Sequence, residues 1–70
     1  MDDRVYRVTE IVGSSTEGID QAIRQALERA QRTLRHLDWF EVTDIRGNLQ
    51  AGQNPTTQVT MKVGFRLEEQ

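Results

Sequence analysis

The sequence predicts an α+β fold of order β-α-β-β, in which one helix packs on one face of a three-stranded antiparallel sheet whose central strand is the third. Three observations lead to this prediction. Residues 4–12 are rich in β-branched and aromatic side chains, residues 19–37 carry an apolar stripe of helical spacing, and residues 58–67 alternate between apolar and polar side chains. At 70 residues the chain has room for one domain, residues 1–70.

The first strand is expected over residues 4–12, with Gly13 ending it. A cluster of helix-capping residue types follows. Ser14 with Glu17 fits a capping box, and Ser15 is an equally good cap. The helix then follows from apolar residues that recur every three or four positions, namely Ile19, Ala22, Ile23, Ala26, Leu27, Ala30, Leu34 and Leu37.

A second strand is expected from about Trp39 to Leu49, followed by a turn at residues 50–55 that contains Pro55. The third strand, Gln58 to Leu67, places Val59, Met61, Val63, Phe65 and Leu67 on one face. We expect the helix to cover that face. The other face, with Gln58, Thr60, Lys62, Gly64 and Arg66, then has nothing to cover it.

The expected hairpin register places Phe40 and Val42 on the helix side and Trp39, with Glu41 and Thr43, on the uncovered side. An outward tryptophan on a small domain marks a subunit interface or a ligand platform more often than chance exposure. In this register Trp39 lies beside Arg66, and Gln58 lies near Gly47, about 25 Å from Trp39. Arg46 points to the helix side in a regular strand, unless a bulge at Gly47 turns it.

Composition limits the possible functions. A core this small usually needs disulfides, a metal or partner subunits, and the chain has no cysteine and a single histidine, His36. Self-association is the device that remains. The net charge of −2 is unfavourable for a nucleic-acid binder, and no apolar run is long enough to span a membrane. The start of the chain lacks a signal peptide, so a cytoplasmic location is expected.

Four segments together resemble one protein family. They are residues 12–15 (VGSS), 37–42 (LDWFEV), 45–47 (IRG) and 58–67 (QVTMKVGFRL), and in a short chain of β-α-β-β order they resemble the bacterial dodecins. The resemblance extends from about Val5 to Glu68, nearly the whole chain. No single segment is decisive; the combination at these spacings is specific.

The resemblance implies a hollow homododecamer that stores and protects flavin, held in pairs at subunit interfaces, without turnover. FMN is the usual flavin of bacterial members, and some also bind coenzyme A. By position, Trp39 resembles the residue that stacks on the isoalloxazine and Gln58 the one that hydrogen-bonds its polar edge. Arg46 and Arg66 resemble contacts to the phosphate or the ring. The sequence leaves FMN, riboflavin and FAD open as the preferred flavin.

Other interpretations of these residues stay open. Trp39 can serve interface packing alone, Gln58 can be a solvated strand residue, and Arg46 and Arg66 can form interface salt bridges. His36 follows the C-terminal end of the helix, where the basic residues gather, and a dipole or capping role is expected for it instead of catalysis or metal binding. Glu17 or Asp44 can join a cation site at an interface, although solvated carboxylates are commoner.

At the level of the whole protein, the alternative is a structural or coenzyme A-binding oligomeric module. An enzyme is disfavoured, because the sequence has no cysteine nucleophile and no supported serine–histidine–aspartate arrangement.

Overall fold

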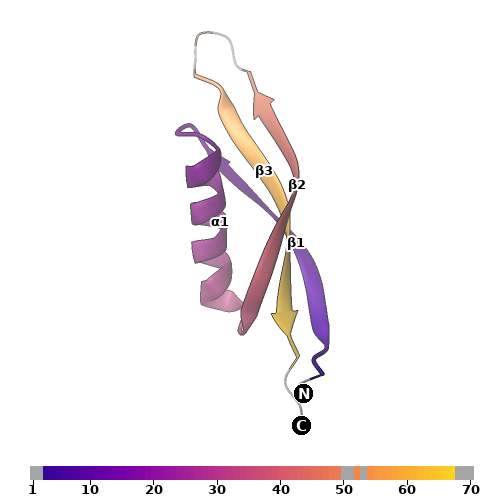
Figure 1. The fold of residues 1–70 in the computed structure, drawn as a ribbon. Coiled ribbons are helices and arrows are strands. Elements are labelled where there is room, and N and C mark those ends of the chain that lie inside the picture. Colours follow the sequence, from indigo (N-terminus) through magenta and orange to yellow (C-terminus); the bar gives the residue numbers. More distant parts are fainter. Residues whose placement is uncertain (1–2, 50–51, 53, 68–70) are drawn as a thin grey trace.

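A computed structural model describes residues 3–49, 52 and 54–67 of the chain. The elements are β1 (Tyr6–Ser15), α1 (Ile19–Thr33), β2 (Leu37–Asn48) and β3 (Thr56–Arg66), in that order (Figure 1). The sheet order is β1-β3-β2, and both strand pairs are antiparallel. This confirms the predicted α+β fold with a central third strand. Parts of the predicted turn (residues 50, 51 and 53) and the tail at 68–70 lie outside the described residues.

The core lies between α1 and the central strand. Val59, Met61 and Val63 of β3 are fully buried, and Ala22 of α1 packs among them. Ile11 of β1 joins this cluster together with other members of the helical stripe. Because the helix presents alanine here, it lies close to the sheet.

The start of the helix differs from the prediction. β1 does not end at Gly13 but runs to Ser15, paired with β3 throughout. A side chain at Gly13 would overlap the carbonyl oxygen of Ala22. Glycine at this position marks the close approach of α1 and not a turn. Neither predicted serine caps the helix. The N-cap is Gly18, whose φ of 115° suits glycine, and no side chain caps the helix there. Ser15 Oγ instead accepts a hydrogen bond from the backbone N–H of Glu17 at 2.9 Å.

The helix also ends earlier than its apolar stripe, at Thr33. Leu34 is already extended, and the following turn places His36 at a φ of 61°. Leu37 begins β2, so the last two leucines of the stripe pack against the core from outside the helix. His36 lies against Arg66: its Nδ1 is 3.2 Å from Arg66 Nη2, and its carbonyl oxygen accepts the Arg66 backbone N–H.

The hairpin register corrects the expected neighbours. Trp39 lies opposite Gly64, not Arg66, and Gln58 lies opposite Arg46, not Gly47. β2 contains two irregularities, between Leu37 and Trp39 and between Val42 and Asp44, and each adds one residue to β2 relative to β3.

The second irregularity decides where Arg46 lies. Thr43 is its extra residue, and the Thr43 hydroxyl donates to the carbonyl oxygen of Thr60 at 3.2 Å. The extra residue reverses the alternation of β2, so Arg46 shares a face with Gln58 and not with the helix. A bulge does move the Arg46 side chain to the uncovered face, but the bulge is at Thr43 and not at Gly47. Gly47 itself pairs regularly with Thr57.

The helix covers β1 and β3 and leaves β2 uncovered (Figure 1). Phe40, Val42 and Ile45 are on the helix side of β2, as their partners Val63, Met61 and Val59 show, yet they are exposed. The molecule is elongated, about 54 × 20 × 15 Å. Within the described residues, α1 is neither long nor apolar enough to cross a bilayer.

Candidate functional site

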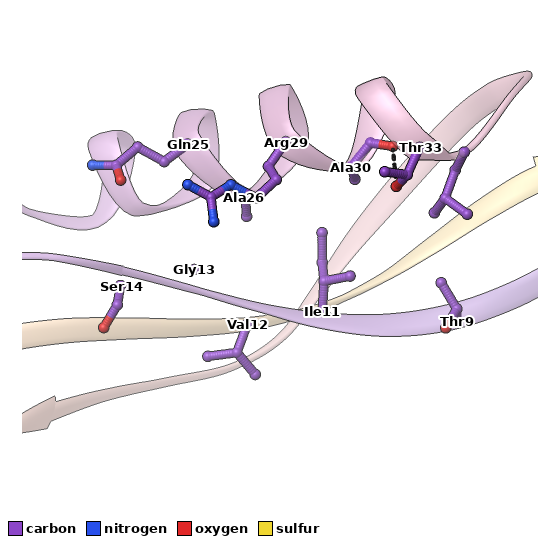
Figure 2. Close-up of a pocket in the computed structure, with 11 residues that line it drawn as sticks. Thr9, Ile11, Val12, Gly13, Ser14, Gln25, Ala26, Arg29, Ala30 and Thr33 are labelled. Atoms are coloured by element: carbon purple, nitrogen blue, oxygen red, sulfur yellow. Dashed lines mark hydrogen bonds between the residues drawn. The ribbon is translucent and has the colours of Figure 1, made fainter.

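The sheet face opposite α1 is the uncovered face, and cross-strand pairing defines it residue by residue. From the chain termini to the hairpin end, its rows are Tyr6–Arg66, Val8–Gly64–Trp39, Glu10–Lys62–Glu41, Val12–Thr60–Asp44 and Ser14–Gln58–Arg46. Figure 2 shows Val12 and Ser14 pointing away from the helix, while Ile11 points toward it. All four residues that the sequence predicts for the site, Trp39, Gln58, Arg46 and Arg66, therefore share this face.

The Trp39 indole lies over the central strand, against Gly64. A Cβ atom added to Gly64 would overlap the Trp39 indole at Cε2, Cζ2 and Nε1. Gly64 is itself buried beneath the ring, whereas Trp39 remains 40% exposed. The indole thus offers an open aromatic surface directly over a glycine.

Tyr6 flanks this indole and was missed as a functional candidate in the sequence. Its ring centroid is 6.3 Å from that of Trp39, at an interplanar angle of 59°, and its hydroxyl donates to Asp38 Oδ2 at 3.1 Å. Strand alternation alone places Tyr6 and Val8 on one face, but no local signal shows that this face is the one with Trp39. That knowledge requires the pairing of β1 with β3.

Arg66 lies one row away from Trp39. It is half-buried, and its guanidinium contacts His36 as described above. Arginine has five N–H donors, so this contact leaves others for a ligand or a partner subunit.

The hairpin end of the face carries the second polar group. Gln58 is half-buried on the central strand, between Ser14 on β1 and Arg46 on β2. Arg46 Nη2 is 3.5 Å from Asp44 Oδ2, and both side chains are more than half exposed. Such an exposed pair is weak, so the guanidinium can exchange this carboxylate for an anionic ligand.

The structure separates the predicted residues into two groups. Trp39 lies opposite Gly64, six residues along β3 from Gln58, which is a separation of roughly 20 Å. The rows between them hold three carboxylates and one amine: Glu10, Glu41, Asp44 and Lys62. One subunit therefore presents an aromatic end and an amide–guanidinium end that cannot reach the same small ring.

A groove of about 650 Å³ lies elsewhere, between α1 and β1 (Figure 2). Its walls are mostly small or apolar, with Arg29 as their single cation, and none of the predicted site residues lines it. It provides no aromatic surface. We therefore place the candidate site on the uncovered face.

The described residues contain no group of three or more histidine, aspartate or glutamate side chains that could hold a metal ion. A cation site at Glu17 or Asp44 has no support from such a cluster and stays a prediction.

These features define a class of protein. Among the residues that the structure describes, the largest fully buried side chains are Met61, Val59 and Val63. Apolar side chains are exposed on both sheet faces, and one face presents a half-exposed indole. Such a subunit can bury its exposed apolar side chains by association with partner subunits.

Comparison with known proteins identifies the family. Residues 5–68 match the family model Dodecin. A curated dodecin from Thermus thermophilus is 54% identical over 66 residues, 94% of this chain and 96% of that protein. The chain belongs to the dodecin family, whose members are oligomeric binders of small molecules.

Solved structures agree. A dodecin from Streptomyces davaonensis superposes with a TM-score of 0.90 at 60% identity, covering 97% of this chain and all of that chain. One from Streptomyces coelicolor gives 0.90 at 57% identity, with complete coverage of both. Variants of the Thermus thermophilus protein also match, with a tryptophan replaced by phenylalanine or one of two arginines replaced by alanine.

Proposed function

We propose that this protein binds and stores flavin, with FMN as the first candidate, at the interfaces of a hollow homododecamer and without catalytic turnover. One observation carries the proposal: the Trp39 indole lies directly over Gly64 and is 40% exposed on a sheet face that no helix covers. An isoalloxazine is a planar aromatic ring, and an indole is the largest side-chain surface on which it can stack.

The remaining groups of the uncovered face match the rest of a flavin. The amide of Gln58 offers both a donor and an acceptor, which suits the alternating polar edge of the isoalloxazine. Arg46 and Arg66 are candidates for the phosphate of FMN, since guanidinium binds phosphate in bidentate fashion. A tryptophan and two arginines are also the residue types replaced in the Thermus thermophilus variants.

The site is shared between subunits in this proposal. Trp39 and Gln58 of one subunit are roughly 20 Å apart, so a flavin stacked on Trp39 takes its amide contact from Gln58 of another subunit. If a two-fold axis relates the two subunits, each contributes Trp39 to one site and Gln58 to the other. Such an arrangement holds flavins in pairs.

Storage and photoprotection follow from the stacking. A flavin enclosed between aromatic rings leaves little room for a substrate, and contact with tryptophan quenches its excited state. We therefore propose a binder that sequesters flavin and not an oxidoreductase. The count of twelve subunits and the cytoplasmic location rest on the resemblance and the sequence, and the exposed apolar residues of β2 support assembly in general.

Titration of FMN fluorescence tests the proposal. The wild type, Trp39→Phe and Trp39→Ala are compared, with light scattering to measure the mass of each oligomer. We expect strong quenching by the wild type, weaker quenching by Trp39→Phe and almost none by Trp39→Ala at unchanged mass. An intact oligomer that quenches neither FMN, riboflavin nor FAD would contradict flavin storage and favour a structural shell or a coenzyme A carrier.

A further inference from the structure

Within one subunit, the Trp39 indole has a glycine below it and an aromatic ring beside it. Below the ring, Gly64 is buried and has no Cβ, and any side chain there would overlap the indole. Glycine weakens a strand interior because it adds backbone entropy and packs nothing, so its presence in the central strand calls for a compensating role. The close approach of the indole is such a role.

Tyr6 lies beside the ring. The tilted packing of the two rings, with centroids 6.3 Å apart, is a favourable aromatic geometry. Tyr6 is fixed in turn, because its hydroxyl donates to Asp38, and Asp38 also pairs with Arg4, whose Nη1 is 3.8 Å away. Asp38 is the residue that precedes Trp39, so this bond ties β1 directly to the backbone that carries the indole.

We propose that Gly64 and Tyr6 are positioning residues, which hold the Trp39 indole in place over the central strand before any ligand binds. This inference rests on the proposed flavin stacking on Trp39 and adds to it a requirement for a preformed surface. An indole that is already immobilised loses less rotamer freedom when a flat ligand stacks on it, and the affinity is correspondingly higher.

The contact between Trp39 and Gly64 has a simpler interpretation, in which the indole covers the glycine and only stabilises the sheet. The two functions differ in what Tyr6 does. If Trp39 only covers Gly64, loss of the tyrosine ring affects stability and leaves flavin affinity unchanged. If Tyr6 orients the indole, loss of its ring weakens binding in an oligomer of normal mass.

The test uses two pairs of variants in the full-length oligomer. Gly64→Ala is compared with Gly47→Ala, since a Cβ at Gly47 meets nothing within 4 Å. Tyr6→Leu is compared with Tyr6→Phe, which keeps the ring and removes only the hydroxyl. Two quantities are measured: the Kd for FMN, and the near-UV circular dichroism of the flavin-free protein. The chain has one tryptophan, so its indole bands report on a single residue.

We expect Gly64→Ala to raise the FMN Kd by about tenfold or more and to weaken the indole dichroism, since the ring must leave its position. Gly47→Ala should stay within about twofold of wild type. Tyr6→Leu should raise the Kd about threefold to tenfold, the value of an aromatic pair, and Tyr6→Phe by less than Tyr6→Leu.

Wild-type affinity and dichroism in both Gly64→Ala and Tyr6→Leu would overturn the inference. Where Gly64→Ala does not assemble, the Tyr6 pair decides, since equal Kd values for Tyr6→Leu and wild type also overturn it. Failure of the proposed function gives a different result: the wild type itself then binds no flavin, and the dichroism of the flavin-free variants decides whether the indole is held.

Discussion

Gly13→Ala tests how closely the helix approaches the sheet. A Cβ atom at Gly13 would overlap the backbone oxygen of Ala22 and lie 2.9 Å from Ala26 Cβ. Both obstacles are short and rigid, one of them backbone, so no side-chain rotation can relieve the clash. The helix must move away from β1, and the contacts of Ala22 with Val59 and Met61 loosen.

The expected cost combines two opposing effects. Overpacking a tight core costs about 1–3 kcal/mol, and a clash with helix backbone belongs at the upper end of that range. Alanine in a strand regains roughly 0.5–1 kcal/mol relative to glycine. The net loss is therefore about 2 kcal/mol, which lowers Tm by on the order of 8–16 °C for a domain of this size.

Thermal unfolding followed by far-UV circular dichroism measures this loss. All proteins are compared at one subunit concentration, because assembly makes Tm depend on concentration. Gly47→Ala is the matched control, and its Tm should equal or slightly exceed that of wild type, since its Cβ has open space. Equal Tm values for Gly13→Ala and Gly47→Ala would refute the close approach of α1 to β1.

Three further predictions concern the core, the phosphate and assembly. Met61→Ala should lower the free energy of unfolding by about 2–5 kcal/mol in urea titrations, because Met61 is fully buried, and a smaller loss would contradict its central place. Arg46→Ala should weaken FMN binding about tenfold in calorimetry and leave riboflavin unchanged, since only FMN carries the phosphate; equal losses would argue against a phosphate contact. Phe40→Asp should reduce the mass measured by light scattering, because the exposed helix side of β2 needs a cover; an unchanged mass would exclude Phe40 from the interfaces.

The sequence was sufficient to predict the order of the elements and the central position of β3. The alternation of residues 58–67 predicts one buried and one open face of the strand, and Val59, Met61 and Val63 are fully buried. The helical stripe predicted most of the side chains that pack on that face, but Ile19, its first member, is exposed. It overestimated the length of the helix, because Leu34 and Leu37 keep helical spacing while lying in an extended segment and in β2.

Features that depend on long-range packing could not be predicted. Gly13 has the local appearance of a strand end, and only the contact with Ala22 shows that it belongs to the strand interior. The irregularity at Thr43 leaves no mark in composition, yet it moves Arg46 to the uncovered face and sets it opposite Gln58. The proximity of Tyr6 to Trp39 likewise depends on the pairing of β1 with β3.

Complementation between subunits tests the shared site most directly. Trp39→Ala and Gln58→Ala subunits are each assembled alone and then co-assembled in equal amounts, and FMN binding is measured by fluorescence quenching. We expect weak FMN binding by either variant oligomer alone. In the equal mixture, about a quarter of the sites should recover wild-type affinity, because they take Trp39 from a Gln58→Ala subunit and Gln58 from a Trp39→Ala subunit. If each variant oligomer binds FMN weakly and the mixed oligomer regains no site of wild-type affinity, Trp39 and Gln58 must serve one flavin within a single subunit. That result would contradict a site shared between subunits.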